Sequence, residues 1–177
     1  MKTRVSAITI VVAAMALLAG CSAFGGGGSG AGAETGTAVP DEQVAVGNEA
    51  AGATDVNQTL RITVDETTAG SEWAEIGATY PRDRFVVDSA THEAITLGVD
   101  TDGDGEIDRR FNETHVSGVN NNEFSFDVTL DTGYTLQEGD VIVVGYPAVD
   151  NPDDPGEYEV EIRLNGEQTV TGTVTVE

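Results

Sequence analysis

The stretch that decides the fold runs from residue 154 to residue 176 and reads DPGEYEVEIRLNGEQTVTGTVTV. On both sides of Asn165-Gly166, apolar residues alternate with polar ones, which places the apolar side chains on one face of a β-strand. Asn-Gly between two alternating runs is the strongest short signal for a β-hairpin, because both residues tolerate positive φ. The stretch therefore predicts two antiparallel strands, at residues 156–164 and 168–176.

The same alternation recurs upstream in short runs that turn residues separate. These runs are 60–64, 73–80, 95–99, 124–130 and 141–146. The run at 141–146 is apolar on both faces, as a central strand would be, and no stretch after Asn57 has a helical period. The pattern predicts an all-β antiparallel domain of seven or eight strands.

One local motif narrows the fold class. Asp154, Gly156, Tyr158 and Val160 stand in a D-x-G-x-Y-x-V arrangement after an apolar run. This resembles the tyrosine corner of immunoglobulin-like sandwiches, where the tyrosine hydroxyl bonds back to the upstream backbone at the entry to the penultimate strand. The resemblance implies an immunoglobulin-like antiparallel β-sandwich; a jelly roll or a small barrel is the alternative.

Two residues depart from the antibody pattern. Val160 stands where antibody domains have a cysteine, and Trp73 lies too far upstream for their usual core tryptophan. We therefore expect a sandwich of the broader immunoglobulin-like kind.

Residues 1–20 have the features of a secretory signal. Lys2 and Arg4 precede an apolar run that is too short to span a membrane, which takes about 20 apolar residues. The run ends in Leu-Ala-Gly-Cys at 18–21, which resembles a lipobox and implies a lipid on Cys21. The alternative is ordinary cleavage that leaves Cys21 as a free thiol.

The segment that follows is rich in small residues. Residues 22–55 hold nine Gly and eight Ala without a sustained period, and such a composition cannot bury a core. We predict a lipidated cysteine and a disordered tether at 21–55, and the β-sandwich domain at 56–177.

The charge is strongly negative and evenly spread. The chain has 31 Asp+Glu against 8 Lys+Arg, a net charge of −23, and cleavage of Lys2 and Arg4 with the leader would give 6 − 31 = −25. A nucleic-acid groove needs clustered cations, so we expect no nucleic-acid partner. Salt at about 1 M shortens the Debye length to roughly 3 Å and would screen the self-repulsion.

This composition and the leader together resemble the lipoproteins and surface glycoproteins of extremely halophilic archaea. The resemblance implies a high-salt habitat and a cell-surface location, and it implies no particular activity. Many of these lipoproteins have a twin-arginine leader, which Lys2-Thr3-Arg4 is not, so we infer the general secretory route.

Known catalytic patterns are missing from the sequence. A blue-copper site needs His, Cys and usually Met, but Met1 and Met15 lie in the leader and Cys21 would carry lipid. No G-x-S-x-G frames a nucleophile, and His92-Glu93 begins no H-E-x-x-H zinc motif. We therefore predict that the chain is not an enzyme.

One acidic run has the spacing of a calcium loop. Carboxylates would come from Asp100, Asp102, Asp104 and Asp108 at positions 1, 3, 5 and 9, with Gly105 at position 6 and Glu106 at position 7. Position 12 is Phe111, where a bidentate Glu belongs, and both flanks have strand patterns. Two interpretations stay open: a weak site for Ca²⁺ or another hard cation, and an acidic hairpin turn.

Asn57 and Asn112 begin two glycosylation sequons, no more than chance would give. They would be modified only if the chain is exported.

Together these features favour a lipid-anchored β-sandwich module on the outer face of the cell membrane, exposed to the extracellular medium. It would bind an unknown surface protein or glycan or interact with the envelope. The alternatives are an enzyme with an unrecognised loop site and a solute-binding lipoprotein, although clamp-like binders use two lobes.

Overall fold

A computed structural model describes residues 43–177, which form two antiparallel sheets with two short 3₁₀ helices. In chain order the elements are β1 (Val44–Val46), β2 (Val56–Thr63), β3 (Glu75–Thr79), β4 (Val86–Val87), η1 (His92–Ala94), β5 (Thr96–Asp100), β6 (Arg109–Phe111), η2 (Glu113–His115), β7 (Val116–Asn122), β8 (Ser125–Leu130), β9 (Val141–Asp150), β10 (Gly156–Leu164) and β11 (Gln168–Val176). Within this part of the chain, no helix is both long and apolar enough to cross a membrane.

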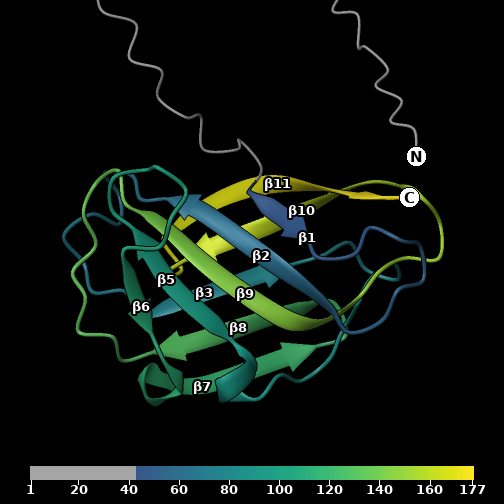
Figure 1. Cartoon of the computed structure of the whole chain (residues 1–177), viewed down its shortest axis with the longest axis horizontal. Helices are drawn as coiled ribbons and strands as arrows, with labels where there is room; N and C mark the ends of the chain where they lie inside the picture. Colours follow the sequence, from purple (N-terminus) through teal and green to yellow (C-terminus); the bar gives the residue numbers. More distant parts are fainter. Residues whose placement is uncertain (1–42) are drawn as a thin grey trace, which may run out of the picture. The chain divides into compact units, whose positions relative to one another are not determined.

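The first sheet has the strand order β1-β2-β9-β5-β6, with β4 also paired to β9, and the second has the order β11-β10-β3-β8-β7. Figure 1 shows the first sheet lying in front of the second. The chain crosses from β9 in one sheet to β10 in the other, as the immunoglobulin-like interpretation requires. The predicted sandwich class is therefore confirmed, although β7 and β8 are added to the second sheet beside β3.

The predicted number of strands is too low, because residues 43–177 form eleven. The missed strands are β1, β4 and β7, whereas β6 lies within the strand pattern expected after the acidic run. Strands β1 and β4 have only three and two residues, too few to show a period of two. Strand β7 has the polar sequence VSGVNNN.

Residues 43–55 belong to the folded part, although the sequence predicts a tether there. In β1, Val44 is fully buried and pairs with Leu60 of β2. Its side chain lies against Gly172 of β11, where an added Cβ would come within 2.7 Å of Val44 Cγ2. One buried valine in a three-residue strand gives no periodic signal. The predicted signal at 1–20, Cys21 and the rest of the tether lie outside the described residues.

The core fills with aromatic and aliphatic side chains from both sheets. Phe126 stacks on Tyr146 at 3.8 Å between ring centroids, and Trp73 meets Phe111 edge to face at 5.5 Å. Trp73 is completely buried, although its place in the sequence differs from that of the core tryptophan of antibody domains. The long segment between β2 and β3 brings it in immediately before β3 begins.

The corner and the hairpin have the local structure that their motifs predict. The Tyr158 hydroxyl donates a 2.6 Å hydrogen bond to the carbonyl oxygen of Asp154, and its ring packs edge to face on Phe85. Asn165 and Gly166 have φ values of 52° and 67° at the β10–β11 turn. Asn165 also accepts hydrogen bonds from the backbone N–H groups of Ala74 and Glu75, which ties the turn to the start of β3.

Candidate functional site

The outward sides of the two sheets differ in charge. On the second sheet, residues that alternate with core positions include five carboxylates. These are Glu157, Glu159 and Glu161 on β10, Glu75 on β3 and Asp127 on β8. This side of the sandwich is therefore acidic, as the composition leads one to expect.

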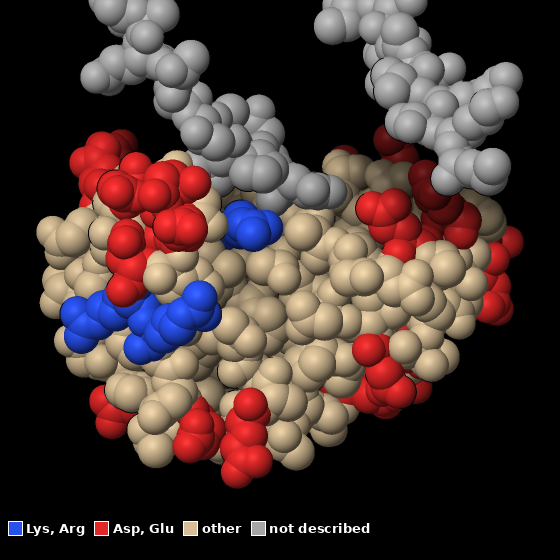
Figure 2. Space-filling model, in the orientation of Figure 1, with Lys and Arg blue, Asp and Glu red and all other residues tan. Residues whose placement is uncertain are grey.

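Between its strand ends, the first sheet has no carboxylate on its outward side; at the end of β5, Asp100 pairs with Val141 and so points outward, but it is 1% exposed. We call this surface the neutral face. It consists of Asn57, Thr59, Arg61 and Thr63 on β2, Val141, Val143, Gly145 and Pro147 on β9, and Thr96 and Gly98 on β5. Figure 2 shows acidic side chains around its rim and cations beside its uncharged centre. In a chain of net charge −23, an anionic partner would meet the least repulsion here.

One row of residues crosses the neutral face through four strands. Arg61 on β2 pairs with Val143 on β9, Val143 pairs with Gly98 on β5, and Gly98 pairs with Arg110 on β6. Residues paired in this way point to the same side of a sheet. The two arginine backbones lie about 14 Å apart, three strand spacings of about 4.8 Å. The strand residues between the two arginines are a valine and a glycine.

A pocket of about 390 Å³ lies over this row, lined by Arg61, Arg110, Val143 and the hairpin residues Gly105, Glu106 and Ile107. Ile107 sits directly on Gly98, where an added Cβ would come within 2.9 Å of Ile107 Cδ1 and closer still to its Cγ2. The absence of a side chain at Gly98 is therefore what admits Ile107 to the wall of the pocket.

The six arginines of the described residues differ in their partners. Arg84 pairs with Asp154 at 2.8 Å and Arg163 with Asp127 at 2.9 Å. Arg82 lies 4.0 Å from the ring centroid of Phe124, and Arg109 lies over Tyr134 and Phe111. Within residues 43–177, Arg61 and Arg110 make neither an ion pair nor a contact over a ring. The pocket thus holds the two guanidinium groups that have no such partner.

The acidic hairpin, residues 100–108, is held by its own carboxylates. Asp100 is 1% exposed and accepts hydrogen bonds from the backbone N–H groups of Gly103 at 2.7 Å and Gly105 at 2.8 Å. Asp108 accepts from both the backbone N–H and the hydroxyl of Thr101 at 2.7 Å, and these bonds lower the pKa of its carboxyl. This network fixes the loop that forms one wall of the pocket.

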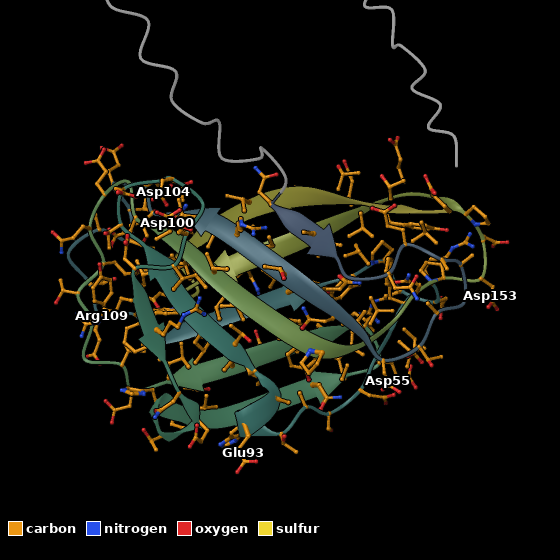
Figure 3. The ribbon with its side chains drawn as sticks, in the orientation of Figure 1. Asp55, Glu93, Asp100, Asp104, Arg109 and Asp153 are labelled. Atoms are coloured by element: carbon orange, nitrogen blue, oxygen red, sulfur yellow. The ribbon has the colours of Figure 1, made fainter. Side chains whose placement is uncertain are left out.

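Three of the five predicted cation ligands come together in the hairpin. Carboxylate oxygens of Asp100, Asp102 and Asp108 lie within 4.8 Å of one another. Asp104, labelled with Asp100 in Figure 3, lies outside this group. Its carboxylate accepts the backbone N–H of Glu106 at 2.8 Å. Glu106 lines the pocket instead. The hydrogen bonds that a hairpin turn needs are present in the structure. Cation binding stays a prediction.

Both sequon asparagines are exposed. Asn57 belongs to the neutral face, whereas Asn112 caps η2 by accepting hydrogen bonds from the backbone and hydroxyl of Thr114. Their glycosylation stays a prediction.

Sequence reasoning missed the pocket, and no local motif could have shown it. Its residues come from β2, β6, β9 and the hairpin, and they meet only through the pairing of strands far apart in the chain. The one sequence feature that could have drawn attention to these arginines is the scarcity of cations, because the described part of the chain has only six.

Comparison with known proteins finds no matching family model and no similar curated sequence. Among solved structures, the chain is similar to the pilus 2b backbone protein of group B streptococcus, with 14% identity and a TM-score of 0.46 over 76% of this chain and 56% of that one. It is similar to an uncharacterized immunoglobulin-like protein of Nocardia farcinica, with 16% identity and a TM-score of 0.38 over 76% of this chain and 96% of that one. A collagen-binding domain of a Staphylococcus aureus adhesin has 14% identity and a TM-score of 0.37 over 70% of this chain and 88% of that one.

The chain thus spans little more than half the length of the pilus protein. At these identities and scores, the description of the fold rests on the chain's own strand order.

Proposed function

We propose that this chain is a lipid-anchored binding module on the outer face of the cell membrane of a halophilic archaeon, and that the neutral face is its binding surface. The observation that carries the proposal is the contrast between the two sheets. Five outward carboxylates cover the second sheet, whereas the middle of the first has none and is flanked by Arg61 and Arg110. A surface freed of like charge is suited to contact.

The proposed cellular location rests on the sequence. The leader with Lys2 and Arg4 supports export, and Leu-Ala-Gly-Cys at 18–21 supports a lipid on Cys21. The Gly- and Ala-rich residues before β1 would give the domain reach above the membrane. The acids spread over the whole chain support a setting of high salt.

The residues around the pocket are suited to binding. They offer two guanidinium donors, one carboxylate acceptor and the aliphatic side chains of Ile107 and Val143. A few convergent polar groups beside apolar surface are typical of ligand sites. We therefore favour binding over catalysis.

The test is capture of partners from envelope material solubilised at high salt, with the full lipidated chain as bait. Thr63→Glu places a negative charge on the neutral face, and Thr173→Glu places the same charge on the second sheet. Both threonines are exposed strand residues, so the two variants are matched. We expect Thr63→Glu to lose partners that the wild type and Thr173→Glu retain. Equal capture by all three chains would refute the proposal.

A further inference from the structure

We infer that the pocket between Arg61 and Arg110 binds an acidic saccharide, a sugar that carries a carboxylate or sulfate group. This inference rests on the proposed function and names the class of ligand for the same face.

The second sheet shows what an arginine in such a row does when it has a partner. Arg163 on β10 pairs with Gly77 on β3, and Gly77 pairs with Asp127 on β8. The Arg163 guanidinium reaches over the glycine and meets the Asp127 carboxylate at 2.9 Å. The chain thus contains a complete arginine–glycine–carboxylate row.

The neutral face has a related row without an acid, in which Ile107 covers the glycine. Arg110 pairs with Gly98, and Gly98 pairs with Val143, which stands where the other row has Asp127. Arg61 follows on the next strand, so guanidinium groups flank the row from both ends. A guanidinium fork matches a carboxylate or an oxyanion with two parallel hydrogen bonds. Val143 brings no carboxylate to this row, so an anionic group of a ligand in the pocket would meet the two guanidinium groups without an internal competitor.

The rest of the pocket favours a sugar over a bare anion. Glu106 lines the same pocket, and its carboxylate would repel a simple anion but accept hydrogen bonds from sugar hydroxyls. Ile107 and Val143 offer aliphatic surface to the C–H face of a sugar ring. A ligand with an anionic group, hydroxyls and an apolar face uses all of these groups together.

The volume of the pocket and the charge of the surface around it agree with an acidic saccharide as the ligand. The volume of about 390 Å³ lies within the range of about 300–1,000 Å³ that small-ligand sites occupy. The outward carboxylate that adjoins the neutral face, Asp100, is 1% exposed, so a longer acidic polysaccharide would meet less repulsion here than on the second sheet. An acidic protein surface could also bind the two arginines, and the experiment below includes an acidic peptide to distinguish it from an acidic sugar.

The experiment is calorimetric titration of the full lipidated chain in detergent, at about 1 M NaCl so that self-repulsion is screened. The probes are tetragalacturonate for the carboxylate, a sulfated fucose tetrasaccharide for the sulfate, maltotetraose as a neutral sugar, inorganic sulfate, and tetraglutamate as an acidic peptide. We expect one or both acidic sugars to bind more tightly than the other three probes. Their relative affinities show which anionic group the pocket prefers.

Variants assign the binding to the pocket. Arg61→Gln with Arg110→Gln should weaken acidic-sugar binding at least about tenfold, the change expected for one lost hydrogen bond between charged groups. Arg163→Gln is the matched control, because that arginine lies on the second sheet and already has a carboxylate partner. It should change the affinity less than about twofold, with thermal melting to show that both variants are folded.

Three results would overturn the inference: no binding of either acidic sugar, equal binding of tetraglutamate, or equal affinity in the wild type and the double arginine variant. If partner capture still depends on the neutral face in any of these cases, the proposed function stands without this ligand class. If Thr63→Glu leaves partner capture unchanged while the sugar binds through Arg61 and Arg110, the ligand class of the pocket stands. The proposal that the whole neutral face binds partners is then wrong.

Discussion

Gly77→Ala should destabilise the domain because the methyl group has no room. A Cβ at this position would lie 2.7 Å from the carbonyl oxygen of Phe126 and closer still to a carboxylate oxygen of Asp127. The backbone carbonyl belongs to the β3–β8 ladder and cannot move away without disturbing the pairing of Gly77 with Asp127. The Asp127 side chain can move only by leaving Arg163.

Three contributions set the size of the effect. Overpacking in a closely packed region costs about 1–3 kcal/mol. Loss of the Arg163–Asp127 pair adds about 0–1 kcal/mol, because both side chains are more than a third exposed. Alanine also restricts the unfolded chain, which offsets about 0.4–1 kcal/mol. We expect a net loss of about 1–3 kcal/mol, or a fall in melting temperature of roughly 3–12 °C for a domain of this size.

Gly118→Ala is the matched control. Gly118 lies on β7, and an added Cβ would meet only Thr129 atoms at 3.7 Å and beyond, which is ordinary van der Waals contact. This variant should leave the stability unchanged or raise it slightly. Urea denaturation in constant molar NaCl measures both free energies of unfolding. If Gly77→Ala is as stable as Gly118→Ala, the packing of the Arg163–Gly77–Asp127 row described above is incorrect.

Four further predictions concern salt, anchoring, the corner and the hairpin. The melting midpoint by circular dichroism should rise between about 0.1 M and about 2 M NaCl as screening shortens the Debye length, and a constant midpoint would contradict the halophilic setting. Cys21→Ser should release the chain into the medium, and its retention in the membrane fraction would show that the leader is an uncleaved anchor. Tyr158→Phe should cost about 0.5–1.5 kcal/mol in urea denaturation, because it removes the hydroxyl bond to Asp154 but keeps the ring on Phe85, and an unchanged stability would reduce Tyr158 to a packing residue. At about 10 mM CaCl₂, above the roughly 0.1–1 mM dissociation constants of extracellular calcium modules, the midpoint should rise for wild type and not for Asp102→Asn, whereas equal responses would leave the hairpin a hydrogen-bonded turn.

Local features of the fold could be predicted from the sequence because their causes are local. The β10–β11 hairpin follows from alternation around Asn165-Gly166, and the corner bond joins Tyr158 to a residue only four positions away. Short elements gave no comparable signal. Strand β1 has three residues, and Val44 is buried only because Gly172 of β11 leaves space for it.

The candidate site depends on contacts that sequence patterns do not contain. Arg61 and Arg110 are separated by 49 positions, and only the pairing of β2, β9, β5 and β6 places them in one row. The sequence of the acidic run at 100–108 predicts a cation loop or a hairpin turn. In the structure, it also forms a wall of the pocket, because Gly98 admits Ile107.

The partnerless state of Arg61 and Arg110 needs a physical reason in a chain with 31 acids. Carboxylates are close at hand in the hairpin, but Asp100 and Asp108 are occupied by backbone N–H groups of their own loop. Those bonds hold the carboxylates within the turn, so that they do not neutralise the arginines. The other sheet shows that the same architecture readily supplies an internal partner, since Asp127 reaches Arg163 across Gly77. An acid at position 143 would stand in the pocket directly opposite Arg61, so Val143→Asp should weaken acidic-sugar binding while both arginines remain.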